Sequence, residues 1–178
     1  MAMTDGTVAF SSKLALTGTY PPQGVTTGGA ASIRVPWAAN NDPAALTYGT
    51  SSGLVDLITC SDRTLTAGSS GTYDLYTGTD LADLVGGTCA FRKVKLIQIA
   101  IVTGGDTAGV TIGNAASNGW AAFFGAAGNT MTIYPNGPAF AQGSPAGVAV
   151  GSSTKNLKVL NNGAASVTVR ITIAGTSV

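Results

Sequence analysis

Apolar and polar residues alternate with a period of two along most of the chain, which is the pattern of half-buried β-strands. In Val167–Ile173 the apolar residues fall at every second position around the outward-facing Arg170. Residues 91–102 carry a denser apolar run, too apolar for a fully exposed face, and form the strongest predicted strand. The other predicted strands cover residues 8–16, 33–35, 54–60, 63–66, 72–76, 110–112, 120–124, 131–134, 147–150 and 157–160.

Turn residues separate these segments at short intervals. Asn-Gly, Gly-Gly and Gly-Asn pairs, which favour tight turns, occur within residues 104–106, 128–129, 136–138 and 161–163, and a Ser-Asp turn is predicted at 61–62. One or two helical turns are predicted over 79–85, with Thr79 as the cap and Gly86-Gly87 as the stop. Many short strands at roughly 8–12-residue spacing predict an all-β protein, an antiparallel β-sandwich or jelly roll.

The length suits one domain with an N-terminal arm. Residues 1–50 have Gly and Pro punctuation and a stretch at 38–50 without a clear period, and we interpret them as a first strand followed by an extended arm or loop region. A first pair of strands with an ordinary surface loop is the alternative for this region. Residues 51–178 are predicted to form the jelly-roll domain.

Composition argues against an enzyme. The chain has no histidine and no glutamate, its acids are eight aspartates, and only 10% of its residues are charged. Histidine is the commonest general base and metal ligand near neutral pH, so Ser–His and Cys–His catalysis are excluded. We predict no catalytic residue and no cofactor, and a depolymerase that cleaves glycosides with a pair of aspartates remains a distant alternative.

Three aspartates, Asp74, Asp80 and Asp83, lie close enough in sequence to supply oxygen ligands to Ca²⁺. Their spacing is not that of an EF-hand loop, and two of them suit the first turn of a helix, where carboxylates offset unpaired N–H groups. We therefore predict no metal site. The glycine pairs lack the lysine of a phosphate-binding loop and are interpreted as turns.

The net charge is +1, and the basic residues are scattered except for Arg92, Lys93 and Lys95, which are too few to neutralise many phosphates, so we predict no nucleic-acid partner. No apolar run approaches the roughly 18–20 residues that cross a bilayer, and residues 1–6 show no secretory signal, so we expect no membrane partner and synthesis in a cytosol. Cys60 and Cys89 could pair if their strands are neighbours, but two buried free thiols are favoured in such a compartment.

Large side chains supply the candidate contact residues. Arginine is enriched in interface hot spots because its planar guanidinium binds carboxylates through two bonds, and a solvated face is the alternative for Arg170. The predicted interface residues are Arg34, Trp37, Arg63, Arg92 and Arg170. An aromatic sugar site is a further alternative, although a sandwich core is the favoured place for these side chains: Tyr73, Tyr76, Trp120 and Tyr134.

From Arg63 to Gly175 the order of segments resembles the small jelly-roll decoration, or cement, proteins of tailed-bacteriophage capsids. The matching segments are Asp62-Arg63-Thr64-Leu65, Tyr73-Asp74-Leu75, Leu81–Gly86, Phe91–Lys95, Ile112–Ala115 with Trp120, Ile133–Gly137, Leu157–Asn162 and Val169–Gly175. Asn136-Gly137 stands where that group often has Gly-Gly after a proline.

The resemblance implies a non-enzymatic virion protein that forms a homotrimer on the outer capsid surface after assembly in the host cytoplasm. Its partner would be the major capsid protein, whose neighbouring subunits it would bridge and stabilise. The alternative function is a carbohydrate-binding head or tail fibre module that contacts the host surface.

Overall fold

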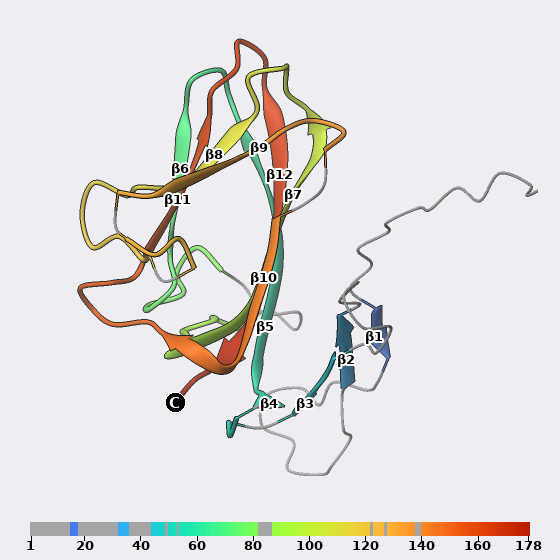
Figure 1. The fold of residues 1–178 in the computed structure, drawn as a ribbon, viewed down its shortest axis with the longest axis vertical. Coiled ribbons are helices and arrows are strands. Elements are labelled where there is room, and N and C mark those ends of the chain that lie inside the picture. Colours follow the sequence, from blue (N-terminus) through green and yellow to red (C-terminus); the bar gives the residue numbers. More distant parts are fainter. Residues whose placement is uncertain are drawn as a thin grey trace, which may run out of the picture.

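The computed structural model describes residues 15–17, 32–35, 44–48, 50–52, 54–81, 87–121, 123–126, 128–137 and 140–178. Within these residues all regular structure is β-strand. Most of it belongs to two four-stranded antiparallel sheets that face each other (Figure 1).

The first sheet has the order β10-β7-β12-β5 and the second the order β6-β11-β8-β9. The strands of the first sheet are β5 (Leu57–Leu65), β7 (Lys93–Gly104), β10 (Phe140–Ala149) and β12 (Val167–Thr176). Those of the second are β6 (Ser70–Asp74), β8 (Val110–Gly113), β9 (Thr130–Ile133) and β11 (Asn156–Asn161).

The pairing of these strands is nested. Strand β5 pairs with β12, β6 with β11, β7 with β10 and β8 with β9, always antiparallel. The chain changes sheet after every strand except between β8 and β9. Two further ladders, β12 with β7 and β11 with β8, join the pairs into sheets. This is the jelly-roll arrangement of two interleaved Greek keys, so the predicted fold class is confirmed.

Four short strands precede the sandwich: β1 (Ala15–Thr17), β2 (Ser32–Val35), β3 (Ala44–Tyr48) and β4 (Leu54–Val55). The first three pair antiparallel, and β3 pairs with β4 in parallel. The strand predicted over 33–35 is confirmed, and of the strand predicted over 8–16 only the end lies within the described residues. Strand β3 falls in a stretch where no period was apparent.

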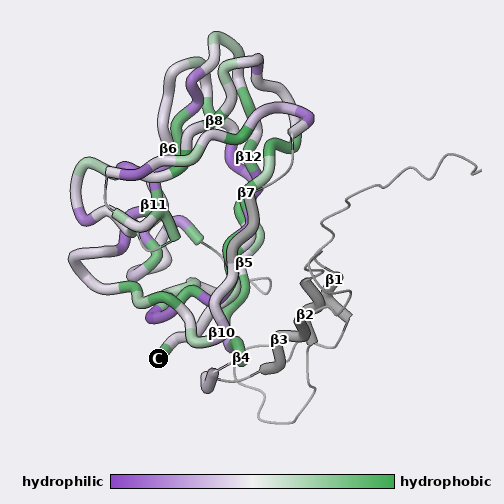
Figure 2. Tube along the Cα trace, in the orientation of Figure 1, coloured by the Kyte–Doolittle hydropathy of each residue, from purple (hydrophilic) through white to green (hydrophobic). Residues whose placement is uncertain are grey.

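The core lies between the inner faces of the two sheets, and the apolar alternation of the sequence produces it. On β12 the inward residues are Val167, Val169, Ile171 and Ile173, each at most 1% exposed. Apolar residues line the inner strands, while polar ones collect in the connecting loops (Figure 2). Burial of such side chains stabilises the fold by roughly 1.5–3 kcal/mol each. The opposing sheet and the loops contribute Tyr73, Leu75, Leu81, Phe91, Val110, Ile112, Trp120, Ile133, Leu157 and Val159.

Three local predictions were wrong. The turn at 61–62 does not exist, because β12 offers a partner along the whole of β5 and the ladder continues through both residues. Of the strand predicted over 120–124, the described residues 120, 121, 123 and 124 are not in a strand: the Trp120 indole donates to the Ala149 carbonyl oxygen at 2.9 Å, and the chain then turns, with Phe124 N bonded to Ala121 O at 2.8 Å. Strand β10 starts at Phe140, before the predicted 147, and a register shift between Gly143 and Val148 accommodates Pro145.

The helical turns predicted over 79–85 fall mainly on residues 82–86, which lie outside the described residues. Thr79 and Asp80 form part of a turn, in which Leu81 N donates to Gly78 O at 3.0 Å.

Gly175 lies at a close approach of β12 to the start of β7. The register of these strands shifts between Ala174 and Gly175, and a Cβ there would meet the Lys93 carbonyl oxygen and lie 2.9 Å from Phe91 Cδ1. Gly175→Ala is expected to lower the free energy of unfolding by roughly 1–3 kcal/mol, the cost of overpacking. Urea unfolding followed by tryptophan fluorescence measures the change.

Gly128→Ala is the matched control, because a Cβ at Gly128 would have no atom within 4 Å. This variant should be neutral, or more stable by up to about 1 kcal/mol through the entropy of the unfolded chain. Equal unfolding midpoints for the two variants would contradict the close packing at Gly175.

Candidate functional site

Four loops meet at one end of the sandwich because the nested pairing brings the connections β5–β6, β7–β8, β9–β10 and β11–β12 to the same side (Figure 1). We call residues 66–69, 105–109, 134–137 and 162–166 the loop end. Backbone hydrogen bonds join its loops: Gly68 N donates to Gly163 O at 3.2 Å, and Gly105 N donates to Ser166 O at 2.9 Å.

Asn161, the last residue of β11, holds the β5–β6 and β11–β12 loops together. Its side chain is 1% exposed, and Nδ2 donates to Leu65 O, Thr66 O and Ala165 O at 3.2, 3.0 and 2.8 Å. Its Oδ1 accepts a hydrogen bond from Gly163 N at 2.9 Å. A buried amide with these partners is fully used, so it stabilises the loops and leaves no group for a ligand.

Asp106 fastens the β7–β8 loop to the β11–β12 loop. Its Oδ1 accepts from Ala108 N at 2.9 Å, and its Oδ2 accepts from Ala164 N at 2.7 Å. The hydrogen bonds from Ala108 N and then Ala164 N favour the charged carboxylate and hold the pKa of Asp106 below its ordinary value. Asp106 is therefore a carboxylate at neutral pH.

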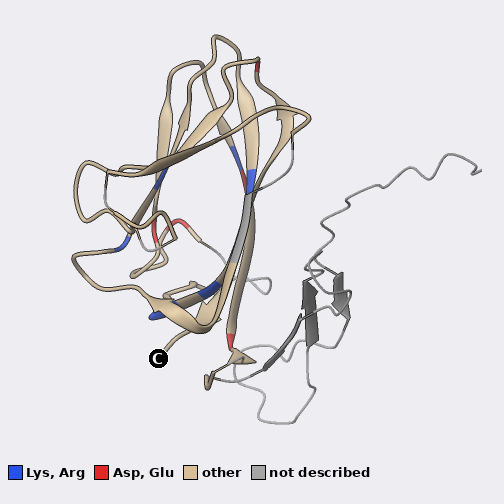
Figure 3. Ribbon diagram, in the orientation of Figure 1, with Lys and Arg blue, Asp and Glu red and all other residues tan. Residues whose placement is uncertain are grey.

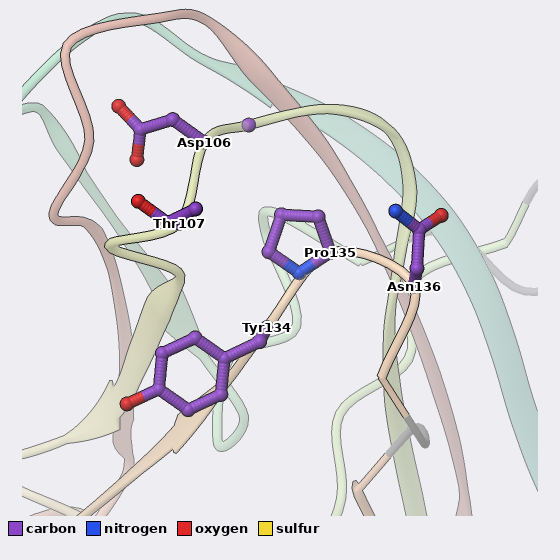
Figure 4. Close-up of a pocket in the computed structure, with 6 residues that line it drawn as sticks. Asp106, Thr107, Tyr134, Pro135 and Asn136 are labelled. Atoms are coloured by element: carbon purple, nitrogen blue, oxygen red, sulfur yellow. The ribbon is translucent and has the colours of Figure 1, made fainter.

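A shallow open depression of about 380 Å³ lies beside Asp106. Pro135 lies between Tyr134 and Asn136, and Asp106 and Thr107 of the neighbouring loop face them (Figure 4). The Tyr134 side chain is 54% exposed. Gly137 N donates to Tyr134 O at 3.0 Å and Asn136 has a φ of 60°, so Pro135 and Asn136 occupy the central positions of a type II turn. The lining residues are Gly105, Asp106, Thr107, Tyr134, Pro135 and Asn136.

Charged residues are few and scattered along the ribbon (Figure 3). Among the predicted interface arginines, Arg63 closes the edge of the sandwich between β5 and β6. Its guanidinium lies 5.3 Å from the centre of the Tyr73 ring, and Nη1 donates to Thr72 O at 3.3 Å. Packing on an aromatic face stabilises the fold and leaves Arg63 only partly available for a partner.

Arg92 has a similar internal role just before β7. Its guanidinium lies 3.9 Å from the centre of the Tyr76 ring, and Nη1 donates to Tyr76 O at 3.0 Å and to Phe91 O at 3.2 Å. Of the other predicted interface residues, Arg34 lies in β2, where only its backbone is described, and Trp37 lies outside the described residues.

Arg170 lies on the exposed outer face of the first sheet and forms a two-bond ion pair with Asp62 on the neighbouring strand. Nε donates to Oδ1 and Nη2 donates to Oδ2, both at 2.7 Å. The hydrogen bond from Arg170 holds the pKa of Asp62 below its ordinary value, against an opposing effect of burial, and the charge of Arg170 adds to the lowering. The side chains are 48% and 41% exposed.

The ion pair lies between two other cross-strand residue pairs of β5 and β12. Thr64 pairs with Thr168 on one side of it, their hydroxyl oxygens 3.0 Å apart, and Cys60 pairs with Thr172 on the other. We call these three residue pairs, with Asp62 and Arg170, the outer β5–β12 face. It is hydroxyl-rich, and its two charges neutralise each other.

The aspartates considered for Ca²⁺ do not converge on a site in the described residues. Asp74 accepts from Lys155 Nζ at 2.6 Å and from the backbone N–H groups of Tyr76 and Thr77 at 2.9 Å. Burial raises the pKa of Asp74, but the hydrogen bonds from Lys155 and Thr77 outweigh it and bring the pKa below its ordinary value. Asp80 is exposed, and Asp83 lies outside the described residues.

The aromatic residues considered for a sugar site are not gathered on one surface. Tyr73 and Trp120 are each 2% exposed and belong to the core, and Tyr76 lies partly buried under Arg92. Tyr134 alone of the four is largely exposed, in the depression of the loop end. The periodic pattern could not separate these cases, because Tyr134 directly follows the last residue of β9.

Neither Cys60 nor Cys89 forms a disulfide, as predicted. Cys89 is buried, with Sγ 3.5 Å from the Ile58 carbonyl oxygen. The prediction of a second buried thiol was wrong, because Cys60 points to the outer face of an edge strand and is exposed.

A buried lysine that the sequence did not single out anchors the segment before the sandwich. Lys95 is 2% exposed, and its Nζ donates to the carbonyl oxygens of Ser51 and Leu54. Burial, and then the charge of Lys93, lowers the pKa of Lys95, while Asp56 opposes the shift. Nearby, Ile58, Ala174 and Leu96 form a buried row on the face turned away from the core.

No protein-family model, curated protein or solved structure matches this chain. Within the described residues, no helix is long and apolar enough to span a membrane. In the same part of the chain, no three His, Cys, Asp or Glu side chains are grouped closely enough to hold a metal ion. The loop end and the outer β5–β12 face are the two described surfaces whose geometry bears on function.

Asp106→Asn tests the carboxylate that joins the two loops. Asn replaces one acceptor oxygen by an amide that faces an N–H donor, so the variant should unfold at lower urea concentration than the parent at pH 7. A lowered native pKa contributes stability above the unfolded pKa of about 4, and this stability is lost as pH falls through the native pKa. The difference in midpoint should therefore shrink between pH 4 and pH 2.

Asp80→Asn is the control for this experiment, since Asp80 is exposed, and its midpoint should follow that of the parent at every pH. A constant difference for Asp106→Asn from pH 7 to pH 2 would show that the carboxylate charge does not stabilise the loop end.

Lys95→Met keeps an unbranched apolar stem but removes the donor to Ser51 and Leu54. The amides that fasten this segment, Leu54 N to Ser51 O and Asp56 N to Gly175 O, should exchange with solvent roughly tenfold faster, equivalent to about 1.4 kcal/mol. Hydrogen exchange measured by NMR gives both rates, with the Val169 amide as a report on global unfolding. Unchanged rates at Leu54 and Asp56 would remove the anchor role of Lys95.

Proposed function

We propose that this chain is a non-enzymatic capsid decoration protein of a tailed bacteriophage. It binds the outer surface of the assembled shell as a homotrimer and bridges neighbouring subunits of the major capsid protein. The proposal combines the resemblance of residues 63–175 to such proteins with a jelly-roll fold, which is found in viral capsid and lectin domains. Because one fold serves many functions, a proposed function must be supported by the properties of the contact surface.

The observation that supports it most directly is the outer β5–β12 face. A surface that is buried against a protein lattice must give up its water, and unpaired charges make this costly. Here the Arg170 guanidinium is already bound by both carboxylate oxygens of Asp62, and the hydroxyl groups of Thr64 and Thr168 lie on one side of the pair. This face can therefore be covered by a partner without leaving an uncompensated charge.

The anchor at Lys95 supports a role for residues 1–50 as an arm. An arm that lies across a neighbouring subunit transmits load only if its root is fixed to the domain. Ser51 and Leu54 are fixed by a 2% exposed lysine, immediately after the predicted arm. The arm's described strands β1, β2 and β3 pair with one another, and an edge of such a small sheet can pair with a strand of a neighbouring subunit.

Decoration stabilises a capsid by linkage. A protein that binds the assembled lattice but not the free subunits adds RT ln(1 + [L]/Kd) per site. A trimer multiplies weak contacts, because binding of one copy raises the effective concentration of the other two. Under these conditions, individually weak contacts on the outer β5–β12 face can together hold the trimer on the capsid.

Titration of the full-length protein onto capsids of the encoding phage that lack it tests the proposal. Bound trimers per shell, counted by quantitative gel analysis and located by electron microscopy, should saturate at the number of threefold lattice positions, which is three copies of the chain per position. The capsid melting temperature should rise with occupancy. Absence of binding, or binding at a few unique positions only, would contradict the proposal.

Matched substitutions identify the face. Thr168→Arg adds an unpaired charge to the outer β5–β12 face and should reduce occupancy, whereas Thr130→Arg places the same charge on exposed β9 of the second sheet. Equal losses for both variants would exclude the outer β5–β12 face as the contact.

A further inference from the structure

The polar side chains of the loop end fall into two groups. Asp106, Asn161 and Asn162 are used internally, the last donating to Thr111 Oγ1 at 2.7 Å. Thr107 and Asn136, by contrast, make no side-chain hydrogen bond to any described residue, and neither does the Tyr134 hydroxyl. The uncommitted groups all line the depression beside Pro135 (Figure 4).

The Tyr134 ring is held in place and still accessible. A Cβ on Gly109 would lie 2.9 Å from Tyr134 Cδ1 and 3.2 Å from Thr132 Cγ2, so the ring packs against the backbone at this glycine. The side chain is nevertheless 54% exposed. An aromatic ring supported on one side and open on the other offers a flat apolar surface with a polar tip.

The surrounding backbone is fixed before any ligand arrives. The type II turn holds Asn136, and Gly109 N donates to Asp106 O at 3.2 Å to close the opposite loop. Asn accepts the left-handed conformation and adds an amide that glycine would lack. Groups ordered in advance lower the entropic cost of binding.

Charge and size restrict the ligand class. The described lining residues include the Asp106 carboxylate but no Lys or Arg, so phosphates and other anions are disfavoured. The volume of about 380 Å³ falls at the lower end of small-molecule sites, roughly 300–1,000 Å³. A flat apolar face beside hydroxyl and amide groups matches a neutral sugar ring, which has an apolar face and a rim of hydroxyls.

We propose that the depression of the loop end binds a neutral pyranose unit of a glycan. The sugar ring lies on the exposed side of the Tyr134 ring, and its hydroxyl groups exchange hydrogen bonds with the Thr107 hydroxyl and the Asn136 amide. This site is separate from the outer β5–β12 face and does not depend on capsid binding.

Saturation-transfer NMR on the full-length protein tests the site with three neutral probes, namely maltotetraose, cellotetraose and the N-acetylglucosamine tetramer, and with polysialic acid as the anionic comparison. At least one neutral probe should show transfer to its ring protons, with weaker or no transfer to polysialic acid. Titration calorimetry then gives Kd for that probe. Transfer to none of the neutral probes, or preference for polysialic acid, would overturn the proposal.

Substitutions assign the binding to this depression. Tyr134→Ala should raise Kd roughly tenfold, equivalent to about 1.4 kcal/mol, while Tyr134→Phe keeps the ring and should stay within a few-fold of the parent. Asn136→Gly retains the turn conformation and removes only the amide, so its weaker binding cannot be attributed to misfolding. Met131→Ala, on an exposed residue of β9 outside the depression, should bind as the parent does. Unchanged Kd in both Tyr134→Ala and Asn136→Gly would exclude this site.

Discussion

The antiparallel ladders of β12 with β5 and with β7 are the interaction on which the rest of the structure depends. The registers run from Val167 to Gly175 against β5 and from Val167 to Thr176 against β7. One strand thus holds together the first sheet, supplies inward residues to the core and carries Arg170 on the outer face. The second sheet, the loop end and the Lys95 anchor are all placed relative to this ladder.

Most of the charged side chains described above are held by contacts within the molecule. Arg63 and Arg92 pack on tyrosine rings, Arg170 is paired with Asp62, and Lys155 is paired with Asp74. Asp106 and Lys95 bind backbone groups instead of opposite charges. On the outer β5–β12 face the two charges are paired with each other, and among the residues that line the depression Asp106 is the charged one. Both surfaces suit binding through shape and hydrogen bonds.

The sequence was informative where burial sets the pattern. Alternation at Val167–Ile173 and the dense run before Val102 led to the right strands, since their inward residues face a continuous core. It failed where pairing overrides local signals: Ser61 and Asp62 read as a turn, yet β12 keeps them in a strand. Pro145 and its glycine neighbours concealed most of β10, because a bulge absorbs them. The strand predicted at Trp120 was wrong, because Trp120 lies in a loop. Its side chain is buried there, and its indole N–H donates a hydrogen bond to Ala149 O.

The candidate site was harder to predict than the fold. Arginine identity indicated contact residues, but whether a guanidinium points to a partner or to a neighbouring tyrosine depends on tertiary placement. Tyr134 and the Asn136 turn were visible in the sequence, whereas their meeting with Asp106 and Thr107 follows from nested pairing between distant strands. The sequence did not indicate that Lys95 anchors the segment before the sandwich, because its partners are backbone carbonyl groups 41 and 44 residues away.

The nested pairing also sets the order in which the chain can fold. Thr64 and Thr168 are neighbours in space but 104 residues apart in sequence, so the first sheet cannot be completed until β12 has left the ribosome. Proteins dominated by such distant pairings fold in milliseconds to seconds, more slowly than helical proteins of similar stability. Until then the apolar faces of β5 and β7 have no permanent cover, which exposes the nascent chain to aggregation. The strand that unifies the sandwich is thus also the last of its eight strands to be synthesised.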